Sequence, residues 1–186
     1  MKKISLLFTL IFVSCSTNQA FSDSAFRIKS SDIKANSTIT NKHVFDGFGC
    51  SGENISPQIS WQNAPKETKS FALTVYDPDA PTGSGWWHYV AINIPTKYSK
   101  LPANFGAENK FKTTEDISQI RNDFGAYKFG GPCPPKGDKP HRYIFTIYAL
   151  KAEKLEVPET ATAALAGFMI NQNVLAKASF EAVYGR

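Results

Sequence analysis

The sequence predicts a mostly β protein: a sandwich of antiparallel sheets with Greek-key crossings and one peripheral helix near the C-terminus. Three observations support this fold class. Three segments of eight residues carry the apolar patterns of buried strands. The segments between them are rich in glycine and proline, and a single Ala-rich stretch close to the end follows a helix-start signal.

The composition is that of one ordinary globular domain. The chain has 186 residues, of which 42% are hydrophobic and 20% are charged, which argues against a disordered or fibrous protein. This length is enough for one domain with a substantial core and too short for two typical domains. No run approaches the roughly 18 apolar residues of a membrane-spanning helix, so a multi-span membrane protein is excluded.

Residues 1–20 have the pattern of a secretory signal peptide. Two lysines precede a short apolar run, Ile4–Val13, and small and polar residues follow it. We therefore expect a single domain over residues 21–186, exported to the periplasm. The apolar run also leads directly to Cys15 in a stretch that loosely resembles a lipoprotein box. A lipoprotein anchored to the membrane through Cys15 is the alternative.

The charge balance does not predict a nucleic-acid-binding protein. The formal net charge is +5, from 21 basic and 16 acidic side chains. Residues 1–20 contain two lysines and no acid, so 19 basic and 16 acidic groups remain after them. These basic residues are scattered and form no run of five or six, unlike a nucleic-acid surface.

Two cysteines remain in the expected mature domain, Cys50 and Cys133. In an exported chain, such a pair suggests a single disulfide. The bond would close a span of 84 residues, for which loop-closure entropy gives about 4.5 kcal/mol of stabilisation. Two buried free thiols are the alternative.

The strands can be assigned in chain order. Residues 22–41 suit a first strand with loops, and residues 47–57 form a Gly-rich turn region. Strands follow over residues 70–77 and 87–94, where alternate positions share one face, and over residues 143–150, where both faces are apolar as in a central strand. The alternating positions are Phe71, Leu73 and Val75 in the first of these strands, and His88, Val90, Ile92 and Ile94 in the second.

The remaining segments are a long connection and a helix–strand end. The connection over residues 95–142 is long enough to carry function or small elements of its own. A helix is predicted over Ala161–Ala176, started by Pro158 and Glu159, and a last strand over Ala178–Tyr184.

Polar side chains occur where the predicted strands begin and end. Asp77 has the phase of the buried face of its strand, so its carboxylate should point inward at the mouth of the strand. Asp79 follows in a turn that Pro78 and Pro81 stiffen. The alternative for both acids is a turn in which they cap backbone amides.

Two histidines and a tyrosine join these acids. His88 has the phase of the inward positions, beside an apolar wall supplied by Trp86 and Trp87, although a satisfied core histidine is the alternative. His141 and Tyr143 are two apart at the start of a strand, so they project from one face.

A Gly/Pro loop over residues 130–137 precedes that last pair. Gly130 and Gly131 would allow a ligand close to the backbone, and the prolines would keep the loop rigid, although an ordinary connecting loop is the alternative. Together these groups could line one small pocket. Imidazoles and backbone N–H groups suit a phosphate, and a carboxylate can accept from an ammonium, so a zwitterionic phosphorylated amine fits both.

Three sequence blocks resemble the phosphatidylethanolamine-binding proteins, also called Raf-kinase-inhibitor-like proteins. The blocks are NISP at 54–57 followed by Trp61, DPDAPTGSGWWH at 77–88, and GPCPPKG at 131–137 with HRY at 141–143. The motif TGSGWWH and the segment NDFG at 122–125 resemble the bacterial branch of this family. The resemblance covers residues 26–186.

The resemblance implies a β-sandwich with a small anion pocket at one end, in a protein without a cofactor. It also implies a disulfide between Cys50 and Cys133, which would tie the pocket loop to the Gly-rich turn. Ligand-binding roles are implied for Asp77, Asp79, Pro81, Trp86, Trp87, His88, Gly131, Pro134, His141 and Tyr143.

The function that we expect is non-enzymatic binding of a phosphate-bearing head group such as phosphoethanolamine. One alternative is a protein-interaction or regulatory module, such as an inhibitor of a kinase or a peptidase, with a protein partner that the sequence does not identify. Another is a metal-dependent hydrolase. Two carboxylates and two imidazoles could bind zinc, but their spacing fits no tight metal motif; they are Asp77, Asp79, His88 and His141.

Overall fold

The computed structural model describes residues 25–113 and 116–186. The predicted signal peptide over residues 1–20, and Cys15 with its expected lipidation, lie outside these ranges. Within them, no helix has the length and apolar character needed to cross a membrane.

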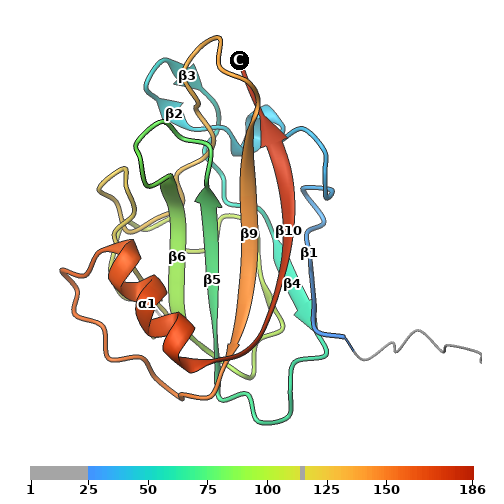
Figure 1. The fold of residues 1–186 in the computed structure, drawn as a ribbon, viewed down its shortest axis with the longest axis vertical. Helices are drawn as coiled ribbons and strands as arrows, with labels where there is room; N and C mark the ends of the chain where they lie inside the picture. Colours follow the sequence, from blue (N-terminus) through green and yellow to red (C-terminus); the bar gives the residue numbers. More distant parts are fainter. Residues whose placement is uncertain (1–24, 114–115) are drawn as a thin grey trace, which may run out of the picture.

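An antiparallel five-stranded sheet forms the centre of the protein (Figure 1). The strands are β5 (Ser70–Asp77), β6 (Trp86–Pro95), β8 (Ser118–Gln119), β9 (His141–Leu150) and β10 (Val174–Tyr184). Their order in the sheet is β10-β9-β5-β6-β8. The strand β5 therefore lies between β6, which follows it directly in the chain, and β9, which comes much later.

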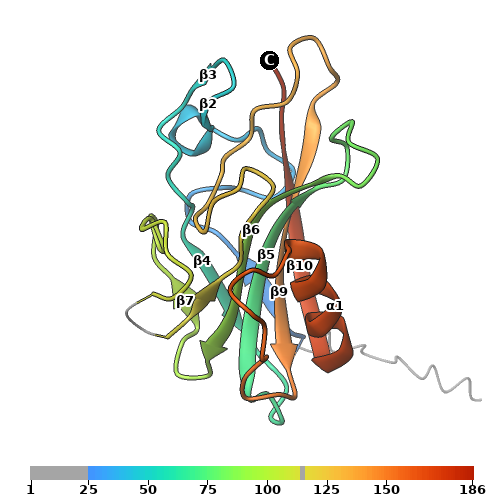
Figure 2. The ribbon, with the colours of Figure 1, turned by 90° about the vertical axis from the view of Figure 1, so that its left-hand side faces the viewer.

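Two further layers cover this sheet, one on each face (Figure 2). One is a three-stranded sheet of β1 (Arg27–Lys29), β4 (Ile59–Gln62) and β7 (Lys100–Leu101), in the order β1-β4-β7. The other is the helix α1 (Ala163–Asn173). The predicted mostly β sandwich with one peripheral helix is confirmed.

A small hairpin stands at the end of the large sheet where β5 ends and β9 begins (Figure 1). It consists of β2 (Asp46–Gly47) and β3 (Cys50–Ser51), and a 3-10 turn, Asn41–His43, precedes it. The hairpin occupies the region that the sequence predicted as a Gly-rich turn.

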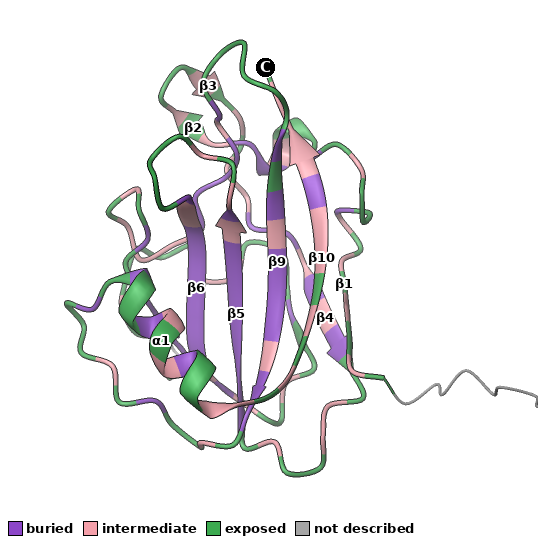
Figure 3. Ribbon diagram, in the orientation of Figure 1, coloured by how far each residue is buried: buried purple, intermediate pink, exposed green. Residues whose placement is uncertain are grey.

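The central strands of the large sheet are buried along most of their length (Figure 3), because a hydrophobic core lies on each face of the sheet. Phe71, Leu73 and Val75 of β5 pack in the core that faces the three-stranded sheet. Ala72, on the other face of β5, packs in the core beneath α1. Full burial of each large apolar side chain contributes about 1.5–3 kcal/mol. The predicted shared face of β5 and the predicted central position of β9 are confirmed.

A bulge in β6 changes the faces that its side chains occupy. Val75 pairs with Tyr89, but the next residue of β5, Tyr76, pairs with Trp87, so His88 is the additional residue of β6. Strict alternation predicted one face for His88 and the aliphatic residues after it. That prediction is wrong, because the extra residue reverses the phase of the strand.

The aliphatic residues of β6 consequently divide between the two cores. Val90 and Ile92 pack beneath α1, whereas Ile94 packs in the core between the sheets. Asn93, between them, has a φ of 62°, which breaks the alternation a second time.

The helix is shorter than the sequence predicts. Thr162, and not Pro158, is its N-cap, because the Thr162 hydroxyl accepts a hydrogen bond of 3.2 Å from the Leu165 N–H. The chain returns to an extended conformation at Val174, so β10 includes residues that were assigned to the helix. Pairing along β9 overrides the helix propensity of this Ala-rich stretch.

Candidate functional site

A cavity of about 210 Å³ lies where β5 ends and where β6 and β9 begin. This volume is below the roughly 300–1,000 Å³ of pockets for drug-sized ligands, so it suits a small ligand or a head group. The lining residues are Phe48, Asp77, Ala80, Pro81, Thr82, Trp86, His88, Phe124, Cys133, Pro134, Pro135, His141 and Tyr143.

Asp77 and His141 form a buried pair on the floor of this cavity. The Nδ1 atom of His141 lies 2.8 Å from Oδ2 of Asp77, and both side chains are almost fully buried. The other carboxylate oxygen of Asp77 accepts from the backbone N–H groups of Asp79 and Ala80, at 2.8 and 3.1 Å. Asp77 therefore points inward and also caps the turn, so both of its predicted roles are present.

The buried His88 ring lies beside this pair. Its Nδ1 atom is 2.6 Å from the Gly130 carbonyl oxygen, which assigns the proton to Nδ1. Burial lowers the pKa of His88 from 6.5 to about 4, although the Gly130 hydrogen bond and the Asp77 charge oppose the shift. The imidazole is therefore neutral at pH 7.

Two side chains of the cavity wall carry buried donors that make no hydrogen bond of standard geometry, although the Tyr143 hydroxyl lies beside the Asp77 carboxylate. These donors are Oη of Tyr143 and Nε1 of Trp86; among the described residues, only His43 and Trp61 have buried side-chain atoms in the same condition. Burial, reinforced by the Asp77 charge, raises the pKa of Tyr143 well above its ordinary value, so the phenol keeps its proton. An unsatisfied buried donor costs about 1–3 kcal/mol and calls for a bound water or ligand.

Asp79 lies at the edge of the site and does not line the cavity. The Arg142 side chain donates to its two oxygens at 2.7 and 2.9 Å, and the Arg142 backbone N–H donates at 2.9 Å. These bonds lower the pKa of Asp79 from 3.8 to about 2. Asp79 thus joins the turn after β5 to the start of β9, which corrects its predicted place in the pocket lining.

Trp87 is on the wrong face of the sheet for the predicted pocket wall. Its ring lies 4.5 Å from the Tyr76 ring and packs with the core beneath α1. Trp87 pairs with Tyr76, and as the immediate neighbour of His88 it lies on the opposite face of the strand by simple alternation, while Trp86 pairs with Asp77 and lines the cavity.

Gly131 is also absent from the cavity lining. Its N–H donates to Oδ1 of Asn54 at 2.7 Å, and a side chain at this position would collide with the His43 carbonyl. The glycine is therefore required for packing of the backbone. Pro81 and Pro134, by contrast, line the cavity as predicted.

Two asparagines that the sequence analysis did not assign to the site hold the backbone around it. Asn54 bonds Gly131 and also donates to the Phe129 carbonyl at 3.2 Å. Asn122 donates to the His88 carbonyl at 3.0 Å and to the Lys128 carbonyl at 2.8 Å. Asn54 begins the NISP segment and Asn122 begins the NDFG segment, so the sequence contained a signal for each of them.

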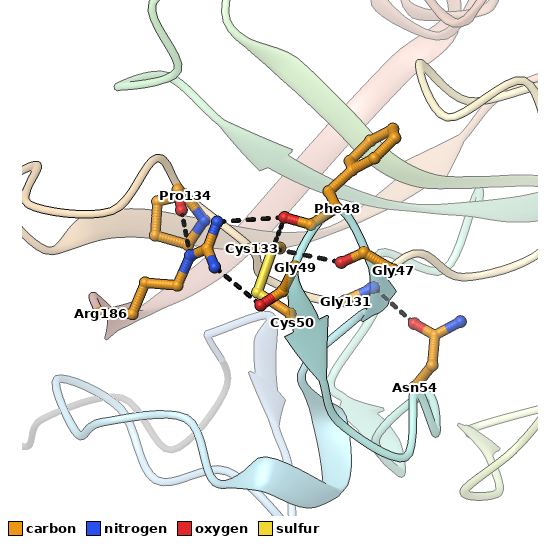
Figure 4. The surroundings of a disulfide bond; sticks show 9 residues. All are labelled: Gly47, Phe48, Gly49, Cys50, Asn54, Gly131, Cys133, Pro134 and Arg186. Carbon is orange, nitrogen blue, oxygen red and sulfur yellow. Dashed lines mark hydrogen bonds between the residues drawn. A yellow bond between two sulfur atoms is a disulfide. The ribbon is translucent and has the colours of Figure 1, made fainter.

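A disulfide joins Cys50 of β3 to Cys133 in the pocket loop (Figure 4). The alternative of two free thiols is therefore wrong. Cys133 itself lines the cavity, so the disulfide fixes one wall of the pocket to the β2–β3 hairpin.

The Arg186 side chain forms a second link across the same junction (Figure 4). Its Nε donates to the Pro134 carbonyl at 2.7 Å, and its terminal nitrogens donate to the carbonyls of Gly49 and Phe48 at 2.9 and 3.2 Å. Sequence patterns gave no signal for this contact, because Arg186 is 137 positions from Gly49.

Replacing Arg186 by alanine is expected to lower the free energy of unfolding by about 1–2 kcal/mol, since three hydrogen bonds from a partly exposed charged donor are lost. Arg186→Lys should be intermediate, because an ammonium lacks the planar fork that reaches three carbonyls. Urea denaturation measures both effects. Stability equal to the wild type in both variants would contradict the assigned link.

The burial of His88 predicts acid sensitivity of the fold. Because the pKa of His88 falls from 6.5 to about 4 on folding, the unfolded chain binds a proton between these values that the native protein does not. Stability should therefore fall by about 3 kcal/mol as the pH drops from 6.5 to 4. The contribution of Asp79 is present above pH 3.8 and is lost only as the pH falls toward 2.

Urea denaturation at a series of pH values tests this prediction through the slope of stability against pH. His88→Gln should flatten the slope between pH 4 and 6.5, whatever its effect on stability at pH 7. Asp79→Asn serves as the control, because it should alter only the more acidic range. An unchanged slope in His88→Gln would assign the acid sensitivity to other groups.

The alternative of a metal-dependent hydrolase finds no ligand cluster. Within the described part of the chain, no three side chains of His, Cys, Asp or Glu are grouped so that they could hold a metal ion. The oxygens of Asp77 and Asp79 are instead engaged by His141, Arg142 and backbone N–H groups.

Comparisons with known proteins agree with this architecture. The family model described as phosphatidylethanolamine-binding protein matches residues 29–185. The chain is 48% identical over 184 residues to YbcL of Escherichia coli (strain K12), covering 99% of this chain and 98% of YbcL. It is 44% identical over 158 residues to YbhB of the same organism, covering 85% and 99% of the two chains.

Solved structures give the same result. The crystal structure of Escherichia coli YbcL, described as a new member of the mammalian PEBP family, has a TM-score of 0.83 at 50% identity, covering 87% of this chain and 98% of that one. A putative PEBP homolog, CT736 from Chlamydia trachomatis, has a TM-score of 0.72 at 28% identity, covering 88% and 99%.

Proposed function

Because the chain belongs to the phosphatidylethanolamine-binding protein family, we propose that it is a non-enzymatic binding protein whose pocket takes a phosphate-bearing head group such as phosphoethanolamine. One observation carries this proposal. Trp86 and Tyr143 line the cavity together with His88 and His141 and carry buried N–H and O–H donors. The Trp86 donor has no partner among the described residues, and the Tyr143 hydroxyl lies beside the Asp77 carboxylate. A phosphate has acceptor oxygens for both donors.

The two histidines have different roles in this proposal. His141 is oriented by Asp77, whose carboxylate accepts a hydrogen bond from the Nδ1–H of the ring. His88 is neutral and has already donated its Nδ1–H to Gly130. An anion beside His88 would stabilise the protonated ring and raise its pKa. Binding of an anionic ligand should therefore take up a proton.

The test is calorimetric titration of the disulfide-intact protein with glycerophosphoethanolamine. The charge of this phosphodiester does not change between pH 5 and 8, so a change in affinity over this range reports the protein. Ethanolamine is the ligand control. Saturable binding that needs the phosphate, strengthens as the pH falls, and takes up a proton in buffers of different ionisation heat would support the proposal.

Two variants make the test specific for the buried donor. Tyr143→Phe removes only the hydroxyl and should weaken binding roughly tenfold or more. Tyr148→Phe, at the far end of the same strand, is the matched control and should leave the affinity unchanged. Absence of saturable phosphodiester binding, or equal affinity in Tyr143→Phe and the wild type, would refute the proposed ligand and favour a role in protein interaction.

We also propose that the protein acts in the periplasm, with the membrane-anchored lipoprotein as the alternative. The pattern of residues 1–20 and the disulfide, which is typical of oxidising compartments, support export. Cell fractionation with labelling by radioactive palmitate separates the two forms. A soluble, unlabelled periplasmic protein is expected; label that is lost in Cys15→Ser would establish the anchor, and a cytosolic protein would refute export.

A further inference from the structure

The acidic groups of the site are already engaged, which leaves the amine of a phosphorylated amine without an obvious partner. Asp77 accepts from His141 and from two backbone N–H groups. Asp79 is held by Arg142 outside the cavity lining. Asp138 also lies outside the lining, 3.5 Å from Nε2 of His141. An ammonium in the cavity must therefore be recognised mainly by groups other than carboxylates.

Aromatic rings line the cavity instead. Phe124 is one of them; its ring centroid lies 5.3 Å from that of Trp86 and 5.8 Å from that of Phe48, and Phe45 stacks on the same ring at 4.3 Å. The face of an aromatic ring carries partial negative charge and attracts a cation within about 6 Å of its centroid. Rings at these separations are close enough for one small cation to contact more than one of them.

Phe48 is largely exposed although its ring packs against Phe45 and Phe124, at centroid distances of 5.5 and 5.8 Å. Its side chain is 69% exposed although it lines the cavity. In Figure 4 its ring points away from Arg186 and the disulfide. An exposed aromatic side chain at the mouth of a pocket is a common mark of a binding surface.

The backbone holds Phe48 in this place at some cost. Phe48 has a φ of 52°, in the left-handed region that non-glycine residues rarely adopt. Arg186 donates to the carbonyls of Phe48 and Gly49, and the next residue, Cys50, carries the disulfide. These contacts fix the backbone that carries the exposed ring, so the position of Phe48 is preorganised for contact with a ligand.

We propose that Phe48, Trp86 and Phe124 form an aromatic cage for the ammonium end of the ligand, so that the pocket prefers a trimethylated ammonium, as in phosphocholine, over a primary one. The inference rests on the proposed function for the phosphate end of the ligand. A primary ammonium has three N–H donors that ring faces satisfy poorly. A quaternary ammonium has none, and aromatic cages are suited to it.

The test compares three phosphate monoesters by calorimetry with the disulfide-intact protein. Phosphocholine carries the quaternary ammonium, phosphoethanolamine the primary one, and 3,3-dimethylbutyl phosphate has the shape of phosphocholine with a neutral carbon in place of nitrogen. Phosphocholine is expected to bind roughly threefold to tenfold more tightly than either of the others. Inorganic phosphate measures the anion end separately.

The variants remove ring character while keeping apolar contact. Phe48→Leu and Phe124→Leu should each reduce the advantage of phosphocholine over 3,3-dimethylbutyl phosphate by roughly threefold. Phe168→Leu is the matched control, because Phe168 is also an exposed aromatic residue, at 58%, but lies on α1 outside the cavity lining. Thermal unfolding confirms that each variant is folded.

Two results would overturn the cage while leaving the proposed function in place. Equal affinity for phosphocholine and 3,3-dimethylbutyl phosphate would mean that the mouth recognises shape and not charge. Tighter binding of phosphoethanolamine, lost in Asp138→Asn, would place the amine on that carboxylate. If no phosphate compound binds, the proposed function fails and choline becomes the probe. Choline binding that weakens in Phe48→Leu would then support the cage, and no choline binding would refute it.

Discussion

Replacing Cys50 and Cys133 together by alanine is expected to lower the free energy of unfolding by about 4.5 kcal/mol. The bond closes a loop of 84 residues, and opening it gives that loop entropy back to the unfolded chain. Ligand affinity should fall roughly tenfold as well, because the pocket loop must then be ordered on binding. Urea denaturation and calorimetry measure the two effects.

Arg186→Ala in the oxidised protein is the control for this prediction. It loosens the same junction between the hairpin and the pocket loop but keeps the covalent loop closed. If the two changes reduced stability by the same small amount, about 1–2 kcal/mol, the disulfide would act through local contacts and not through the unfolded chain. Wild-type protein reduced with dithiothreitol should behave like the alanine pair.

Replacing Asp77 by alanine is expected to destabilise the protein by about 3–5 kcal/mol and to abolish ligand binding. The change leaves the Nδ1–H of His141 and the N–H groups of Asp79 and Ala80 without acceptors in a buried place. Each orphaned group costs about 1–3 kcal/mol. Denaturant titration measures the loss of stability, and titration with glycerophosphoethanolamine measures the loss of binding.

Asp77→Asn separates the two roles of this residue. The amide oxygen can still accept from the turn, so most of the stability should return. The amide nitrogen would face His141, however, and the ring would have to carry its proton on Nε2 instead of Nδ1. Nitrogen-15 NMR of the imidazole reports that tautomer. Retention of the Nδ1 proton in Asp77→Asn would contradict the role assigned to the carboxylate.

The sequence was sufficient for the fold class because the large sheet is buried on both faces. The apolar patterns at residues 70–77 and 143–150 arise directly from packing against two layers. The ends of these strands also carried the correct polar residues, since Asp77, His141 and Tyr143 meet in one cavity. Strand phase placed these three on one face of the sheet, because β5 and β9 pair with each other without a register shift.

The errors in the site have physical causes that a linear pattern does not contain. One additional residue at His88 reversed the phase of β6, so that Val90 and Ile92 pack beneath α1. Trp87, next to His88, lies on the opposite face from the pocket. Asp79 and Gly131 have the residue types of a binding site but serve to join β5 to β9 and to allow close backbone packing. The roles of Phe48 and Arg186 could not be predicted from the sequence, because Arg186 is separated from Phe48 and Gly49 by more than half of the chain.

The position of the disulfide along the chain also divides the central sheet into two parts. The strands β5, β6 and β8 lie between Cys50 and Cys133, whereas β9 and β10 follow Cys133. The closed loop therefore holds one half of the central sheet, and the other half adds to the open edge of β5. We expect the β5–β6 hairpin to form early and the distant pairing of β5 with β9 to be slow. Since Asp77 and His141 lie on opposite sides of that junction, we expect the pocket to be completed late in folding.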